Sequence, residues 1–189
     1  MTKETEELVK AYELMPHPEG GFFSQRHESR HSYSAGARYK DDPNATQEDD
    51  SDKRLAMTHI YYLLCNNDFS GWHKIKSEEL WTFYSGCALL LHIINPETKE
   101  KNTVVLSNSP KEGVLTYLIP RDYWFAAEVA DKENGHSFVG CTVSPGFDFR
   151  DWTLAQRDDL TQFMSDNNRN DIERLIREEQ TEDTAKLTV

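Results

Sequence analysis

Short segments rich in β-branched and aromatic residues follow one another between residues 55 and 147. No helical periodicity separates them, and the connections contain Asn, Asp, Pro and Gly, which favour turns. Strands that succeed one another in this way without intervening helices predict an all-β sandwich or barrel. The predicted strands cover residues 57–64, 71–75, 80–85, 88–94, 102–106, 114–120, 123–129 and 136–144.

The segment before this region has a different pattern. Residues 4–15 carry Leu8, Ala11, Tyr12 and Met15 at helical spacing, which predicts a short amphipathic helix. The sequence PHPEGG ends this helix, because two prolines and a double glycine do not continue one. The sequence FFSQRHES then predicts the first strand.

The segment after the predicted strands is helical in pattern. TLAQRDDLTQFM and NDIERLIREE, which begin at residues 153 and 170, predict one or two C-terminal helices. Thr153 and Asn170 are the expected N-caps. These helices follow the strands directly, so no second domain is predicted.

An acidic insertion interrupts the domain between residues 34 and 54. It has almost no apolar residues, so we expect a solvated surface loop within one domain that spans residues 1–189. The expected core covers residues 7–165, and residues 166–189 form a helical tail. Acidic residues crowd the insertion: Asp41, Asp42, Glu48, Asp49, Asp50 and Asp52.

The charge balance limits the partners that a chain of 189 residues can have. The formal net charge is -12, which argues against a nucleic acid polymer and against an anionic lipid surface as partners. The N-terminus has no apolar stretch of the signal-peptide type, and the apolar run CALLLHII is too short to cross a membrane. We therefore expect a cytoplasmic protein. Its three cysteines, Cys65, Cys87 and Cys141, are widely spaced and are expected to be free thiols.

The sequence GWHKIKSEELWTFYSG contains the candidate functional residues of the predicted strands. Residues two apart in a strand share a face, so His73 and Ile75 point the same way. Glu79, Trp81 and Phe83 share a face of the next strand. If both faces point inward, they form a pocket with one imidazole, one carboxylate and aromatic walls.

This stretch resembles the first motif of the cupins. That motif contains a glycine, His-x-His, three or four further residues, a Glu, six residues and a closing glycine. His73, Glu79 and Gly86 match it, whereas Ile75 replaces the second histidine.

The second cupin motif, Pro-x-Gly-x-x-His, is matched less well. Pro120 is present in PRDYWF, but Asp122 stands at the glycine position and Phe125 at the histidine position. Two of the four usual metal ligands are therefore absent.

A closer resemblance is to the small cupin-5-type family. The segments HPEGGFF, IYYLL, GWHKIKSEELWTFYSG, LIPRDYWFAA and FVGCTVSPGFDFRDW carry it, over roughly residues 7–165. The resemblance implies a double-stranded β-helix, or jelly roll, similar to that of the dTDP-keto-sugar epimerases. It also implies a homodimer. Many chemistries share this fold, so function must be argued from the site.

The pattern of possible metal ligands is incomplete. A stable zinc, iron or manganese site needs at least three protein ligands, and the motif supplies two. His59 and His92 are further histidines on predicted strands, but their spacing indicates no site. We expect no cofactor, and if a metal is bound, His73 and Glu79 are the expected ligands.

Acid–base catalysis without a metal is the leading hypothesis. His73 is a candidate general base, and Glu79 a carboxylate that would orient it. In the similar epimerases a histidine removes a proton and a tyrosine returns one from the other face. Tyr61, on the predicted core strand IYYLL, is the candidate acid, and the alternative is that it only packs.

Aromatic residues complete the predicted pocket. Trp81, Phe83, Trp124 and Phe125 are candidate ligand-binding walls, although core packing is the alternative for each. Glu19, in HPEGG, either reaches into the pocket or lies in a bend.

These residues predict a pocket for a small polar metabolite, sugar- or nucleotide-like, with isomerase or epimerase chemistry. A non-enzymatic ligand sensor is one alternative. A metal-dependent enzyme with a non-standard ligand set is the other.

Overall fold

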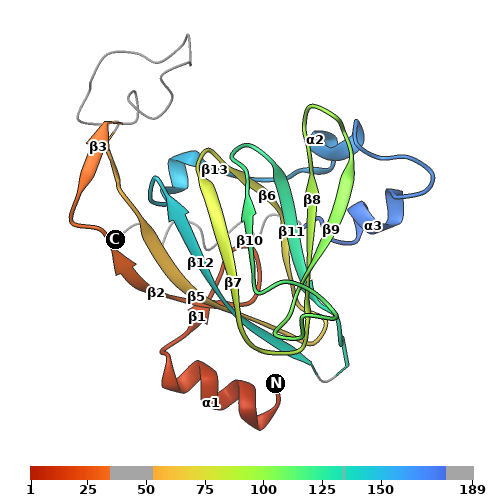
Figure 1. Ribbon diagram of the computed structural model, residues 1–189. Coiled ribbons are helices and arrows are strands. Elements are labelled where there is room, and N and C mark those ends of the chain that lie inside the picture. The colour runs from red at the N-terminus through yellow and green to blue at the C-terminus, as the bar shows by residue number, and fades with distance from the viewer. Residues whose placement is uncertain (35–52, 134, 178–189) are drawn as a thin grey trace.

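Two antiparallel β-sheets form the body of the protein (Figure 1). The computed structural model describes residues 1–34, 53–133 and 135–177. One sheet has the strand order β1–β2–β5–β12–β7–β10, with β1 Met15–Pro16, β2 Phe22–Glu28, β5 Thr58–Cys65, β12 His136–Ser144, β7 Glu78–Gly86 and β10 Thr116–Ile119. The other has the order β13–β6–β11–β8–β9, with β13 Trp152–Leu154, β6 Phe69–Ile75, β11 Trp124–Val129, β8 Leu89–Ile94 and β9 Lys101–Leu106.

The predicted all-β class is confirmed, and each of the predicted strands between residues 57 and 144 corresponds to a strand of these sheets. Alternation explains how the strands build the core. In β7, Glu79, Trp81 and Phe83 are buried, while Glu78 and Leu80 on the opposite face are exposed. The buried faces of the two sheets meet in one apolar cluster, which removes their side chains from water.

A short hairpin borders the acidic insertion. Its strands are β3 Ser32–Ser34 and β4 Lys53–Leu55, which pair antiparallel. The prediction of a surface loop over residues 34–54 falls mainly on residues 35–52, which lie outside the described ranges. Arg54 is buried and donates two hydrogen bonds to the Asp151 carboxylate. This pair joins the hairpin to the chain just before β13.

The N-terminal helix is shorter than predicted. Helix α1 spans Lys3–Ala11 rather than residues 4–15. The chain turns at Glu13, which has a φ of 53°, and Met15 then pairs with β2. The helix covers the outer face of the six-stranded sheet, where Leu8 and Tyr12 pack against Leu63 and Phe138.

The C-terminal helices begin later than predicted. Thr153 is not an N-cap, because Trp152–Leu154 pairs with β6 as an additional strand. Helix α2 spans Arg157–Thr161 with Gln156 as its N-cap, and helix α3 spans Arg169–Glu173 with Asn168, rather than Asn170, as its N-cap. Residues 178–189 of the predicted tail lie outside the described ranges.

The C-terminal segment covers the outer face of the five-stranded sheet (Figure 1). Leu160, Phe163 and Ile172 pack there against Trp72 and Trp124. Every residue of β11 is consequently buried, since this strand is covered on both faces. Among the helices of the described residues, none has the length and apolarity needed to cross a membrane.

Candidate functional site

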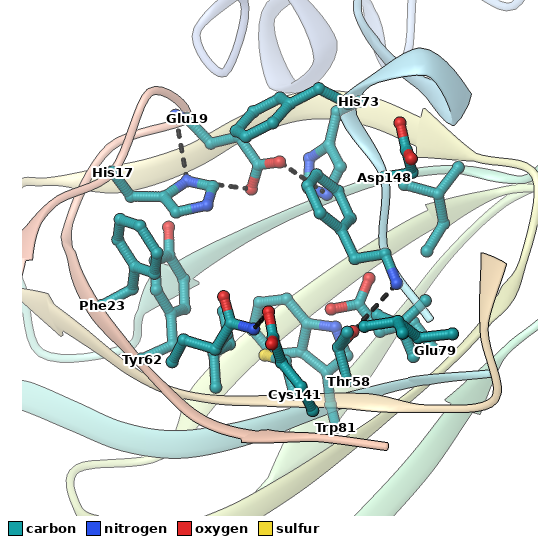
Figure 2. A pocket seen from close by; sticks show the side chains of 18 of the residues that line it. His17, Glu19, Phe23, Thr58, Tyr62, His73, Glu79, Trp81, Cys141 and Asp148 are labelled. Carbon is teal, nitrogen blue, oxygen red and sulfur yellow. Dashed lines mark hydrogen bonds and ion pairs between the residues drawn. The ribbon is translucent and has the colours of Figure 1, made fainter. Parts of the chain in front are cut away.

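A cavity of about 820 Å³ lies between the two sheets. This size is within the range of pockets that hold small ligands. Its walls come from both sheets, from the turn before β2 and from residues 147–150 (Figure 2). Seven of its lining residues are buried side chains that titrate or donate hydrogen bonds: Glu19, Thr58, Tyr62, His73, Glu79, Trp81 and Cys141.

The turn that carries Glu19 is held in place by its glycines. Gly20 has a φ of +110°, and a Cβ there would lie 2.1 Å from the Phe69 carbonyl oxygen. Only glycine tolerates both conditions. The Tyr62 hydroxyl donates to the Gly20 carbonyl at 2.7 Å, and the Gly71 amide donates to the Glu19 carbonyl at 2.9 Å. HPEGG therefore both bends the chain and directs Glu19 into the cavity.

The Glu19 carboxylate is surrounded by donors. Ser70 Oγ donates to Oε2 at 3.1 Å, and Trp152 Nε1 donates to Oε1 at 2.5 Å. His73 Nε2 lies 3.3 Å from Oε1. These contacts hold the Glu19 carboxylate at a fixed position in the wall of the cavity.

His73 is held by a partner at each ring nitrogen. Its Nδ1 lies 2.8 Å from the Gly71 carbonyl oxygen, which accepts a hydrogen bond from that nitrogen. The Phe125 ring packs edge-on against the imidazole, with the ring centroids 3.9 Å apart. The carbonyl can only accept, so Nδ1 carries a hydrogen, and Nε2 is the nitrogen that faces Glu19. Glu19, rather than Glu79, is the carboxylate beside it.

His17 is a site residue that the sequence analysis did not identify. Its Nδ1 accepts the backbone N–H of Glu19 at 3.2 Å. Burial lowers the pKa of His17, and the neighbouring Glu19 opposes this shift in part. A neutral His17 therefore presents an N–H at Nε2. His17 is the first residue of HPEGG, so its position two residues before Glu19 was the signal that could have identified it.

Glu79 lies on the opposite wall, on β7 of the six-stranded sheet. Burial, and then the negative charge of Glu19, raise the pKa of Glu79 to about 8. The Cys141 thiol and the Trp81 indole lower it by smaller amounts. Glu79 is therefore mainly protonated at neutral pH, and its carboxyl group donates a hydrogen bond.

This raised pKa predicts a pH-dependent contribution to stability. Below about pH 4.5 the Glu79 carboxyl is protonated in both states, and its contribution is fully present. Between about pH 4.5 and 8 only the unfolded chain ionises, so the contribution is lost as the pH rises. The free energy of unfolding of the wild type, minus that of Glu79→Gln, should fall by up to about 1.4 kcal/mol per pH unit and level off above that range.

Urea titrations at several pH values measure this difference. Glu78→Gln is the matched control, because Glu78 is exposed on the same strand and its curve should run parallel to that of the wild type. A pH-independent difference between wild type and Glu79→Gln would contradict the raised pKa.

Several predicted site residues lie elsewhere. Tyr61 faces the outside of the six-stranded sheet, where it packs against Tyr12 and Phe138. Tyr62 lines the cavity instead, because consecutive residues of a strand point to opposite faces. The candidate acid role of Tyr61 does not fit this placement.

The four aromatic residues predicted to line the pocket also lie in different places. Trp81 lines the cavity. Trp124 faces the C-terminal segment, and Lys74 Nζ lies 4.5 Å from the centroid of its ring. Phe83 belongs to the core, and Phe125 supports His73 from behind. Phe23, Tyr62, Phe147 and Phe149 supply the further aromatic surface of the cavity.

The four positions of the cupin metal set do not form a ligand cluster here. His73 and Glu79 occupy two positions on opposite walls, and apolar Ile75 and Phe125 occupy the others. His59 contacts Thr142, and His92 contacts Glu128 outside the cavity. Within the described ranges, no three His, Cys, Asp or Glu side chains are grouped so that they could hold a metal ion.

Comparisons with known proteins agree with this fold. A hypothetical protein from Leishmania major is 27% identical, with a TM-score of 0.74, over 94% of this chain and 100% of that one. A protein of known structure from Shewanella oneidensis is 29% identical, with a TM-score of 0.72, over 91% and 96% of the two chains.

A cupin 2 domain-containing protein from Halorhodospira halophila shares the fold at 12% identity, with a TM-score of 0.52 over 87% and 88% of the chains. These similarities confirm the double-stranded β-helix. No curated protein matches the chain. The family model for Cupin_5, described as cupin superfamily (DUF985), matches residues 6–155. Because this match covers most of the chain, the protein belongs to the Cupin_5 family of the cupin superfamily.

Proposed function

We propose that the protein is a metal-independent acid–base enzyme of the isomerase or epimerase type, acting on a small polar metabolite in the cavity. One observation carries the proposal. His73 and Glu79, two buried groups that exchange protons, lie on opposite walls of one cavity of ligand size. Proton removal by one group and proton delivery by another is the chemistry that such an enzyme requires.

The surroundings of His73 suit a general base. The Gly71 carbonyl keeps the proton on Nδ1, so an unprotonated Nε2 is available to accept a second one. Once Nε2 is protonated, the Glu19 carboxylate 3.3 Å away stabilises the imidazolium. Glu19 thus takes the supporting role that the sequence analysis gave to Glu79.

Glu79 suits the role of the acid. A pKa of about 8 keeps its proton in place at neutral pH, yet close enough to ionisation for transfer. The phenol that lines the cavity, Tyr62, is less suited, because its hydroxyl donates to the Gly20 carbonyl and burial raises its pKa. Glu79 therefore replaces Tyr61 as the candidate acid.

Solvent exchange tests this proposal. Chelator-treated protein is incubated in D₂O with a panel of keto sugars and keto nucleotide sugars, and deuterium on carbon is measured by mass spectrometry. We expect exchange next to the carbonyl group of at least one compound. Glu79→Gln should slow it about 10- to 100-fold, since an amide still donates a hydrogen bond but transfers no proton. Glu78→Gln should leave it unchanged.

A non-enzymatic binding function is the second candidate. The aromatic side chains Phe23, Tyr62 and Phe147 around the cavity favour it, because such walls bind flat or apolar faces of ligands. A compound that binds the wild type tightly but never gains deuterium would support this candidate and contradict the enzyme.

A further inference from the structure

A buried donor without a partner lines the cavity. Trp81 is 1% exposed, and its Nε1 has no hydrogen-bond partner of normal geometry among the described residues. Two other indoles of the protein differ, since Trp72 donates to the Ile172 carbonyl and Trp152 donates to Glu19. An unsatisfied buried N–H is costly and rare in native proteins. The Glu79 carboxyl, whose pKa the indole lowers, lies near it without a hydrogen bond of normal geometry, so an oxygen atom of a ligand would give the Trp81 N–H a better acceptor.

Glu79 supplies a second donor at the same place. It lies two residues before Trp81 on β7, so both side chains share the inner face of the strand. Figure 2 shows the Trp81 indole nitrogen next to the Glu79 carboxyl group. With Glu79 protonated, this part of the cavity wall presents the indole N–H of Trp81 and the carboxyl O–H of Glu79 side by side. Each can donate to one oxygen atom of a ligand.

We propose that Trp81 and Glu79 form a subsite for an acceptor oxygen of the ligand, a carbonyl oxygen that becomes an enol oxygen during the reaction. The subsite rests on the proposed acid–base function, and it narrows the substrate class to enolisable ketones and aldehydes. Two buried donors aimed at a developing oxyanion stabilise it more than the ground-state carbonyl. A neutral carboxylic acid beside another buried donor serves this purpose in other isomerases.

The proton and electron movements balance in this arrangement. His73 Nε2 takes the proton from the carbon next to the carbonyl group, and the electrons of that C–H bond form a C=C bond. The π electrons of the carbonyl move to its oxygen, which takes the proton of Glu79 and leaves a carboxylate. Trp81 Nε1 donates to the same oxygen throughout. The product is the enol form, an enediol when the neighbouring carbon carries a hydroxyl group. His73 then returns its proton to the former carbonyl carbon, the neighbouring hydroxyl gives its proton to the Glu79 carboxylate as the new carbonyl forms, and the isomer results.

The charges of the inner cavity define which part of the ligand enters. The Glu19 carboxylate is negative, and Glu79 becomes negative once it has given up its proton. A phosphate or carboxylate group of a ligand that entered between these two groups, which lie on opposite walls, would be repelled by both. The carbonyl end of the substrate is therefore the neutral end.

Indole NMR tests the subsite directly. The probe is cyclohexanone, titrated into ¹⁵N-tryptophan-labelled protein at pH 6.5, with methylenecyclohexane as the control that lacks the oxygen. We expect cyclohexanone to move the Trp81 indole proton downfield and the control not to do so. The Trp72 indole, already bonded to Ile172, should not respond. Trp81→Phe assigns the signal and should weaken cyclohexanone binding roughly two- to tenfold, the loss of one hydrogen bond.

The dependence on pH adds a readout for Glu79. Above about pH 8 the wild-type response should disappear, because an ionised Glu79 repels the carbonyl oxygen. In Glu79→Gln the response should persist at that pH, since the amide remains a donor. The subsite would be overturned if the Trp81 indole signal did not respond to cyclohexanone, or if it moved equally with methylenecyclohexane.

These outcomes are separate from the test of the proposed function. Cyclohexanone bound in the cavity without contact to Trp81 would overturn the subsite, while deuterium exchange decides the enzyme. Contact with Trp81 in a protein that exchanges no deuterium would support the subsite and contradict the catalysis.

Discussion

Replacing His73 with asparagine should slow carbon-bound deuterium exchange by roughly 10²- to 10⁴-fold, the usual contribution of one general base. Asparagine retains a donor for the Gly71 carbonyl, so the local structure should be kept. It lacks a nitrogen that can accept a proton at the position of Nε2. Initial rates in D₂O at saturating substrate measure the loss.

His27→Asn is the matched control, because His27 is an exposed residue on β2. Its exchange rate should equal that of the wild type. Far-ultraviolet circular dichroism and thermal unfolding establish that both variants are folded. A folded His73→Asn protein with an undiminished rate would contradict the role of His73 and move the proton transfer to another group.

Replacing Trp72 with alanine should lower the free energy of unfolding by about 3 to 5 kcal/mol, as for other large aromatic side chains in a core. Trp72 is 0% exposed and follows Gly71 on β6. Its ring is directed away from the cavity and packs against the C-terminal segment. The variant loses this apolar contact and leaves the Ile172 carbonyl without the indole donor. Urea denaturation monitored by circular dichroism measures the change.

Leu115→Ala is the comparison for this experiment. Leu115 is 57% exposed, so its truncation should change the stability by no more than about 0.5 kcal/mol. Because Trp72 precedes His73 on the strand, the variant should also weaken any ligand that binds the wild type. If Trp72→Ala lowered the free energy of unfolding by less than about 1 kcal/mol, the C-terminal segment would not be part of the cooperative fold.

The strands could be predicted because their signal is local. β-branched and aromatic residues, turn residues and two-residue alternation all act within a few positions of one another. The same alternation predicts that Glu79 and Trp81 share a face, and the structure has them both on the cavity wall. The helix boundaries failed where a tertiary contact decided them, as when Thr153 joined β6 through a strand.

The partners of the site residues could not be predicted, because they are distant in the sequence. The carboxylate that contacts His73 is Glu19, which comes from a turn 54 positions earlier in the numbering and not from the neighbouring strand. Ser70, Trp152 and His17 complete its surroundings through contacts that no spacing rule contains. Tyr61 and Trp124 show the remaining difficulty, because a shift of one residue along a strand moves a side chain to the opposite face.

The hydrogen bond between Trp152 and Glu19 has a consequence for the order of folding. It joins residues separated by 133 positions, and Trp72 in turn bonds to Leu175 through its backbone amide. During synthesis Glu19 and His73 leave the ribosome long before these partners. Non-local pairing of this kind folds slowly, and an unfinished sheet exposes apolar surface in the meantime. The contact between Glu19 and His73 can therefore reach its final geometry only after residues 152–175 have been synthesised.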